Sequence, residues 1–252
     1  MAQLFRELEQ GACHLWCWRT AASFDETLAA RGVGFLSEDE MERYRRYLVP
    51  EAARTFLAAR VLLRSVLSEY IDRSPASWRF ALNPWGRPYL AADDILPALA
   101  FNLSHKPGFV ACLVGANREL GVDVEDASAA RPHLLAIAER FFSPSEAAAL
   151  RALPAAGQMN RFYELWTLKE SYIKARGVGL SLGLSQFSFS VGGETAGISF
   201  DPGFDDIASR WDFRLFRSHA PYLLATAIQL ERRPLAILMK DGAEVTARAL
   251  RL

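Results

Sequence analysis

Three charged side chains suited to phosphate or metal chemistry stand within residues 161–180, RFYELWTLKESYIKARGVGL: Lys169, Glu170 and Lys174. The spacing of the apolar residues around them predicts one helix, and Gly177 stands where a C-terminal cap is expected. Glu170 and Lys174 are four residues apart, so they share a helix face in the order that favours an ion pair. A solvated helix face is the alternative interpretation.

A second acidic set lies upstream in residues 121–126, GVDVED. Apolar and acidic residues alternate there as in a strand, so Asp123 and Glu125 project from one face and the valines from the other. Two adjacent carboxylates repel each other unless a cation lies between them. With Glu170 from a facing helix, they would supply the oxygen ligands that a hard divalent cation needs. The alternative is an edge strand whose solvent-facing side is simply polar.

Donors suited to an anionic ligand also occur in the first half of the chain. Residues 102–105, NLSH, end a predicted strand with a hydroxyl and an imidazole, and Gly86-Arg87-Pro88 predicts a rigid turn that offers a cation. Positive charge is added by Arg43, Arg45, Arg46 and Arg54. Arginine binds phosphate bidentately through strong charge-assisted hydrogen bonds, which makes phosphate the expected partner. For each arginine, an ordinary surface position is the alternative.

Length and composition exclude several classes of protein. The 252 residues fit one large domain or two modest ones, and 51% hydrophobic with 23% charged residues supports a packed core rather than disorder. Lys plus Arg and Asp plus Glu both number 29, so the basic excess of a non-specific nucleic-acid binder is missing. Because there is neither a bilayer-spanning apolar run nor a signal-peptide pattern, we expect a cytoplasmic protein without a membrane partner.

The cysteines also favour a reducing setting. Cys13, Cys17 and Cys112 are an odd number without the spacing of a disulfide framework. Cys13, His14 and Cys17 could be pictured as metal ligands, but in the alternating segment ACHLWCW the two cysteines share one face and His14 takes the other. We therefore interpret them as core residues.

The elements that position these residues follow one order twice. In the first half we expect a strand at 12–20, helices at about 24–30, after the capping box 37–40 and at 51–70 beyond Pro50, and strands at 78–82, 87–90, 101–104 and 109–114. In the second half we expect a strand at 121–125, helices at 134–142, after the capping box 143–146 and from 161, and strands at 187–190, 197–200, 211–216 and 222–229.

This repeated order predicts an α/β (α+β) protein of two similar halves related by a pseudo-twofold, each a small sheet packed with helices. We expect the first half at residues 1–116 and the second, with the carboxylates, at 117–230. Residues 231–252 would be a C-terminal extension of no predicted function. A ligand cleft would lie between the halves.

Five segments carry a family resemblance: GRPYL, FNLSHKPG, GVDVED, RFFSPSE and FYELWTLKESYIKARGVGL. In this order they resemble the 4′-phosphopantetheinyl transferases, specifically the longer two-halved kind similar to the surfactin-synthetase activator. The resemblance spans residues 43–189, and GVDVE together with WTLKESYIK is its specific part. It implies an enzyme that transfers the phosphopantetheine arm of coenzyme A to a serine of an apo acyl-, polyketide- or peptidyl-carrier protein and releases 3′,5′-ADP.

The resemblance also implies roles for single residues. Mg²⁺ would be held against the coenzyme A pyrophosphate by Asp123, Glu125 and Glu170. Phosphate contacts would come from Lys169, Lys174, Ser104 and His105, with His105 at the 3′ position, and from Arg43, Arg46 and Arg54. Arg87, where the family often has lysine, and Pro88 would border the adenine. Glu146 also matches a family position, but its place in a capping box explains it.

The charges then predict a mechanism. Glu170, directly or through a metal-bound water, is the candidate general base for the carrier serine. Lys174 would stabilise the departing 3′,5′-ADP, and Lys169 would stabilise the transferring phosphoryl oxygens. Mg²⁺ would withdraw charge from the pyrophosphate and fix an in-line geometry.

Two other functions fit parts of the pattern. A metal-dependent nuclease usually has a lysine two residues after a strand acid, but Ala127 stands there and the net charge is zero. A non-catalytic carrier-protein or nucleotide-binding module would not need Asp123, Glu125, Glu170 and Lys174 together. We expect a monomer whose two halves form a pseudo-dimer.

Overall fold

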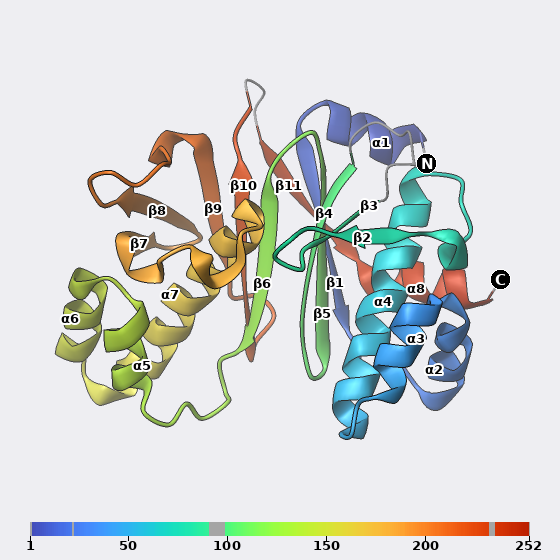
Figure 1. Ribbon diagram of the computed structural model, residues 1–252, viewed down its shortest axis with the longest axis horizontal. Coiled ribbons are helices and arrows are strands. Elements are labelled where there is room, and N and C mark those ends of the chain that lie inside the picture. The colour runs from blue at the N-terminus through green and yellow to red at the C-terminus, as the bar shows by residue number, and fades with distance from the viewer. Residues whose placement is uncertain (1, 22, 91–98, 232–234, 252) are drawn as a thin grey trace. The chain divides into compact units, whose positions relative to one another are not determined.

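The computed structural model describes residues 2–21, 23–90, 99–231 and 235–251 (Figure 1). The chain divides into two compact units. The first consists of Met1–Asn83, Pro88–Asn117 and Arg232–Leu252, and the second of Pro84–Arg87 and Arg118–Glu231. Each unit is a β-sheet packed against helices, so the predicted α/β class with two halves is confirmed.

The first unit is built on a four-stranded sheet of order β11-β1-β5-β4, beside which β2 and β3 form a separate hairpin. Its elements are α1 (Ala2–Glu9), β1 (Ala12–Arg19), α2 (Glu26–Gly32), η1 (Val33–Phe35), α3 (Glu38–Arg45), α4 (Pro50–Tyr70), η2 (Pro75–Ser77), β2 (Phe80–Leu82), β3 (Pro88–Leu90), β4 (Leu99–Lys106), β5 (Phe109–Ala116), β11 (Ala236–Asp241) and α8 (Gly242–Arg251). Helix α4 packs against β4 and β5, and its apolar face supplies much of the core.

Two parts of this unit differ from the expectation. Residues 2–9 form helix α1, which is absent from the predicted elements. Residues 236–251, expected to lie in a C-terminal extension at 231–252, belong to the first unit: β11 pairs in parallel with β1, Ala12 beside Ala236, and α8 packs on α4. The sequence did not indicate this pairing, because a parallel pairing between segments far apart in the chain has no local sequence signal.

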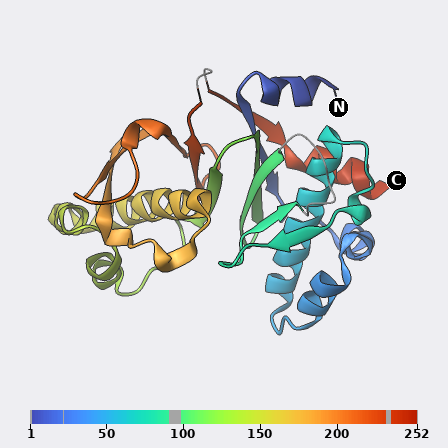
Figure 2. The ribbon, with the colours of Figure 1, turned by 45° about the horizontal axis from the view of Figure 1, so that its top comes forward.

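The second unit is built on a five-stranded antiparallel sheet of order β6-β10-β9-β8-β7. Its elements are β6 (Leu120–Asp126), α5 (Leu134–Phe141), α6 (Pro144–Ala152), α7 (Ala155–Arg176), η3 (Gly179–Ser181), η4 (Leu184–Gln186), β7 (Phe187–Gly192), β8 (Thr195–Phe200), η5 (Ala208–Arg210), β9 (Trp211–Phe216) and β10 (Tyr222–Gln229). Helix α7, yellow in Figure 2, lies along this sheet and contacts four of its strands. An aromatic core fills the space between them.

The helix ends agree with their sequence signals. Ser37 with Glu40 and Ser143 with Glu146 each form a complete capping box, the second with a proline in the first turn. Helix α7 ends at Gly177, whose φ of 65° and ψ of 19° lie in the left-handed region that favours glycine. Helix α7 begins at Ala155, however, six residues before the expected start.

The three cysteines are buried with free thiols, as expected for core residues. Burial raises the pKa of Cys17 to about 12. Of the helices in the described ranges, none combines the length and the hydrophobicity that a bilayer crossing needs.

Candidate functional site

The centre of the candidate site is the contact between β6 and α7 in the second unit. At Gly121 the two backbones are so close that a Cβ atom would lie 2.1 Å from the Ser171 carbonyl oxygen and 2.4 Å from the Ala175 nitrogen. Gly121 therefore faces α7, and by strand alternation Asp123 and Glu125 share that face. Both acids are buried, at 5% and 6% exposure. Because Gly121 has no side chain, β6 can pack close to α7, and the two carboxylates lie beside this helix.

Lys174 supplies the positive charge at this contact. Its Nζ donates a hydrogen bond to Asp123 Oδ1 at 2.6 Å, across from α7 to β6. Glu170 lies one turn earlier on α7 and is half-buried. An ion pair to a buried carboxylate offsets part of the free energy lost when that carboxylate leaves water.

Lys169 lies in a different place from the one predicted. Its side chain is fully buried, and its Nζ donates to the carbonyl oxygens of Leu184 at 2.9 Å and Phe187 at 2.6 Å. It also lies 2.7 Å from Glu146 Oε2. Three acceptors use the three N–H donors of an ammonium group. Burial lowers the pKa of Lys169 and Glu146 opposes that shift. This placement corrects the predicted phosphate contact, because the donors point into the core.

Arg87 connects three segments of the second unit. Its Nη1 donates to the Ala175 carbonyl oxygen at 2.7 Å and its Nη2 to the Leu120 carbonyl oxygen at 3.2 Å. These carbonyls belong to the last turn of α7 and the first residue of β6. Burial lowers the pKa of Arg87, while Glu119 raises it. Arg87 therefore helps to hold β6 against α7, a role that the sequence pattern did not indicate.

The other predicted ligand residues belong to the first unit. Pro88 begins β3, and Ser104 and His105 are neighbours on β4, Ser104 buried and His105 exposed. Alternation directs these two side chains to opposite faces of the strand. Their contacts with adenine and phosphate stay predictions.

The three arginines predicted to contact phosphate are exposed on the first unit. Arg43 lies over the ring of Phe56, 5.2 Å from its centroid, and Arg54 lies over Phe24 at 5.8 Å. Arg46 pairs with a glutamate one turn earlier. Stacking on a ring leaves the edge of a guanidinium able to donate hydrogen bonds, so Arg43 and Arg54 keep donors for an anion.

A hard divalent cation needs several oxygen ligands that lie close together. Within the described part of the chain, no three Asp, Glu, His or Cys side chains are grouped as a ready metal site. The chemistry of the donors nevertheless fits a hard cation in kind, because Asp123 and Glu125 present carboxylate oxygens toward the helix that carries Glu170. These are the residues that could hold Mg²⁺.

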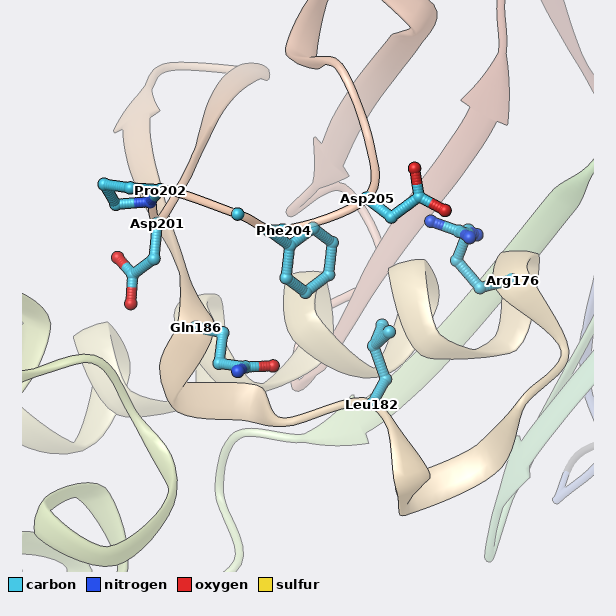
Figure 3. Close-up of a pocket in the computed structure, with 8 residues that line it drawn as sticks. Arg176, Leu182, Gln186, Asp201, Pro202, Phe204 and Asp205 are labelled. Atoms are coloured by element: carbon cyan, nitrogen blue, oxygen red, sulfur yellow. The ribbon is translucent and has the colours of Figure 1, made fainter.

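A pocket of about 280 Å³ lies beside the end of α7 (Figure 3). Arg176 and Asp205 lie at one end of it, and the ring of Phe204 points between Gln186 and Leu182. None of the predicted ligand residues lines this pocket. It separates the loop at residues 201–207 from the η3 and η4 segment.

Both units match family models. Residues 23–117 match "4′-phosphopantetheinyl transferase, N-terminal" and residues 119–227 match "4′-phosphopantetheinyl transferase superfamily". The 4′-phosphopantetheinyl transferase HetI of Nostoc sp. is 36% identical over 166 residues, which is 65% of this chain and 69% of that protein. The chain belongs to the 4′-phosphopantetheinyl transferase superfamily. The resemblance read from the sequence is confirmed.

Other members of the superfamily extend the match. The 4′-phosphopantetheinyl transferase Sfp of Bacillus subtilis is 37% identical over 158 residues, 63% of this chain and 67% of that protein. A phosphopantetheinyl transferase of Thraustochytrium sp. is 29% identical over 233 residues, 86% of this chain and 79% of that protein. The two family models meet where the first unit passes into the second, between residues 117 and 119. The boundary between the two family models therefore coincides with this passage, although β1, β11 and α8 of the first unit lie outside both models.

Proposed function

We propose that the chain transfers the 4′-phosphopantetheine arm of coenzyme A to a serine of an apo carrier protein and releases 3′,5′-ADP, with Mg²⁺ as cofactor. The observation that supports this most is the β6–α7 contact, where Asp123 and Glu125 face the helix that carries Glu170 and Lys174. The names of the superfamily members HetI and Sfp support the same reaction.

Asp123, Glu125 and Glu170 would hold the magnesium ion. When bound, Mg²⁺ supplies positive charge to the coenzyme A diphosphate and makes its phosphorus a better electrophile. Carboxylate oxygens suit this ion better than nitrogen or sulfur ligands do. The close packing at Gly121 keeps the two strand acids beside the helix.

The protein side chains then move one proton and balance charge. Glu170 accepts the hydroxyl proton of the carrier serine, whose oxygen forms the new bond to phosphorus. The bond from that phosphorus to the 3′,5′-ADP oxygen breaks, and 3′,5′-ADP leaves with the electron pair. Lys174, whose Nζ lies 2.6 Å from Asp123, would stabilise the negative charge of the departing 3′,5′-ADP. Arg43, Arg46, Arg54, Ser104 and His105 would supply the remaining phosphate contacts.

The test is a direct transfer assay. The protein is incubated with coenzyme A, Mg²⁺ and, in parallel, apo carrier proteins of the fatty-acid, polyketide and peptide-synthetase types. Intact-protein mass spectrometry should show one phosphopantetheine group on a carrier, and none on the same carrier with its acceptor serine replaced by alanine. If coenzyme A binds but every carrier of the panel stays apo, the chain is a binding module and the proposed activity is wrong.

The setting proposed for this activity is a reducing cytoplasm, because the three buried cysteines carry free thiols. We also propose a monomer, since both family modules are present in one chain. Sedimentation equilibrium at the assay concentration checks the second point, and a dimer mass would contradict it.

A further inference from the structure

A buried aspartate holds the last two turns of α7 from the side opposite the candidate site. The Asp206 side chain has no exposed surface. Its Oδ2 accepts hydrogen bonds from Tyr172 Oη and Arg176 Nη1, both at 2.6 Å, and from Trp211 Nε1 at 2.9 Å; Oδ1 accepts from the Ile207 nitrogen at 2.8 Å. Burial alone would raise the pKa of Asp206, but the bonds from Tyr172, Ile207 and Trp211 hold it below its usual value.

The residues that Asp206 holds interleave with the candidate site residues along α7. Tyr172 and Arg176 are one turn apart, as are Glu170 and Lys174. At about 100° per residue, the two pairs lie about 200° apart around the helix axis. The Asp206 side therefore carries none of the residues predicted to react, but it contacts the same two helix turns that carry Glu170 and Lys174.

The clamp formed by Asp206, Tyr172 and Arg176 is tied to the sheet at both ends. Tyr172 is fully buried and meets Phe187 and Trp211 edge-on, each with ring centroids 5.1 Å apart. Arg176 Nε also lies 3.6 Å from Glu119 Oε2, directly before β6. The same guanidinium thus connects the loop that carries Asp206 to the strand that carries the acids.

We infer that Asp206 is a positioning residue, which sets the rotation of the end of α7 through Tyr172 and Arg176 and so keeps Lys174 against Asp123. This inference rests on the proposed function for its catalytic meaning, but its physical content, the position of Lys174, is independent of activity. Buried charged hydrogen bonds of this kind are strong and directional, so removing the charge should loosen the helix end without touching a site residue.

Asp205 provides a matched control. It directly precedes Asp206 in the chain, it is exposed, and it lines the pocket beside Arg176 (Figure 3). Asp205→Asn removes the same charge near the same arginine but none of the hydrogen bonds of the clamp. A general loss of negative charge near Arg176 would affect both variants equally, whereas the clamp predicts an effect only of Asp206→Asn.

The lysines give a readout that needs no activity. The sequence contains four: Lys106, Lys169, Lys174 and Lys240. After ¹³C labelling of lysine, the side-chain Cε signals are few enough to assign with Lys174→Ala. We expect Asp206→Asn to move the Lys174 signal toward the position of a solvated lysine, with the Lys106 and Lys240 signals and the Asp205→Asn spectrum unchanged. A folded Asp206→Asn protein with an unmoved Lys174 signal, or an equal shift in Asp205→Asn, overturns the inference.

Tyr172→Phe keeps the test decisive if Asp206→Asn does not fold. It removes the two hydrogen bonds of the Tyr172 hydroxyl, to Asp206 Oδ2 and from Arg176 Nη1, but keeps the bond between Asp206 and Arg176 and the ring packing. The Lys174 signal should therefore move in the same direction by a smaller amount. A folded Tyr172→Phe protein whose Lys174 signal matches the wild type would equally overturn the inference.

Measurements of kcat then test whether the position of Lys174 affects the rate of transfer. Asp206→Asn should lower kcat at least tenfold in the wild-type background but less than twofold in a Lys174→Ala background, because the aspartate acts through that lysine. Equal fold-losses in both backgrounds would show a merely structural role and contradict the inference. If the wild type transfers no phosphopantetheine, the proposed function fails, and the lysine spectra still decide the positioning role.

Discussion

Lys169 Nζ and Glu146 Oε2 lie 2.7 Å apart, and the two side chains are only 1% and 3% exposed. The same glutamate completes the capping box of α6 and accepts a hydrogen bond from the Phe189 nitrogen at 2.8 Å on its other oxygen. One carboxylate thus joins α6, α7 and β7. The capping-box explanation of Glu146 is confirmed, but the cap is only part of what this residue does.

Breaking this buried pair should destabilise the second unit strongly. Lys169→Met leaves the Glu146 carboxylate buried without its counter-charge, which typically costs about 3–5 kcal/mol. Urea unfolding followed by circular dichroism measures the change.

The double variant provides the control. Lys169→Met combined with Glu146→Gln removes both charges, so its loss should be smaller than the sum of the single losses. If Lys169→Met unfolds like the wild type and instead raises the KM for coenzyme A, the predicted phosphate contact was right and the structural role is wrong.

Gly121 should tolerate no side chain. A Cβ atom there would lie 2.1 Å from a backbone oxygen of α7, so Gly121→Ala must push β6 away from the helix. Overpacking of this kind costs about 1–3 kcal/mol or more. Gly157→Ala is the matched control, because the structure has open space at that helical position and alanine favours the helix by roughly 0.5–1 kcal/mol. The midpoint temperature of thermal unfolding should fall for Gly121→Ala and rise slightly for Gly157→Ala. Equal midpoint changes in the two variants would contradict the close contact.

His14 should make stability depend on pH. Its ring is fully buried in the first unit, with Nδ1 2.7 Å from Tyr70 Oη and Nε2 3.0 Å from Glu7 Oε2, and Lys240 is nearby. Burial, followed by the charge of Lys240, lowers the pKa of His14 to about 4. The unfolded chain, with an ordinary pKa of about 6.5, therefore binds this proton first as the pH falls.

The free energy of unfolding should accordingly decrease as the pH drops from 7 to 5, by roughly 2 kcal/mol from this group. The Glu7 carboxylate, held below its usual pKa, would add its own loss only at lower pH. Urea unfolding across this range is the measurement. The His14→Gln protein should be less stable at pH 7, and its free energy of unfolding should change less with pH. A pH dependence equal to that of the wild type would show that His14 is not the cause.

Glu170→Gln should stop turnover and leave the fold intact. A general base contributes about 10²–10⁴-fold to rate, so kcat should fall at least about 100-fold. Glu139→Gln is a suitable control, since Glu139 is an exposed acid of α5 that pairs with Arg151. Steady-state transfer rates, with circular dichroism to verify folding, check both variants. A near-normal rate in Glu170→Gln would remove the base assignment.

Local sequence signals predicted the helix ends that have a capping residue, and the strand that carries the two acids. Capping boxes, the glycine after α7 and the alternation in residues 121–126 each depend on neighbouring residues only, so they can be read directly. They also sufficed to place Asp123 and Glu125 on one face and Glu170 with Lys174 on another element. The family match came from these same short segments.

Contacts between distant residues could not be predicted in this way. Lys169 and Glu146 are 23 residues apart, and nothing near Lys169 distinguishes a buried ammonium from an exposed one. Asp206 stands in an irregular loop without a motif, although it holds α7 through two residues. The parallel pairing of β11 with β1 joins the ends of the chain. Each of these three contacts is determined by tertiary packing and not by neighbouring residues in the sequence.

The central claim is that three carboxylates from β6 and α7 together hold a divalent cation for coenzyme A. Mn²⁺ titration in the presence of coenzyme A, followed by electron paramagnetic resonance, tests it most directly. We predict one Mn²⁺ per chain, bound at least tenfold more weakly in Asp123→Asn, Glu125→Gln and Glu170→Gln. Asp126→Asn, an acid that strand alternation puts on the other face of β6, should bind within twofold of the wild type. Wild-type affinity in all three site variants would contradict the claim.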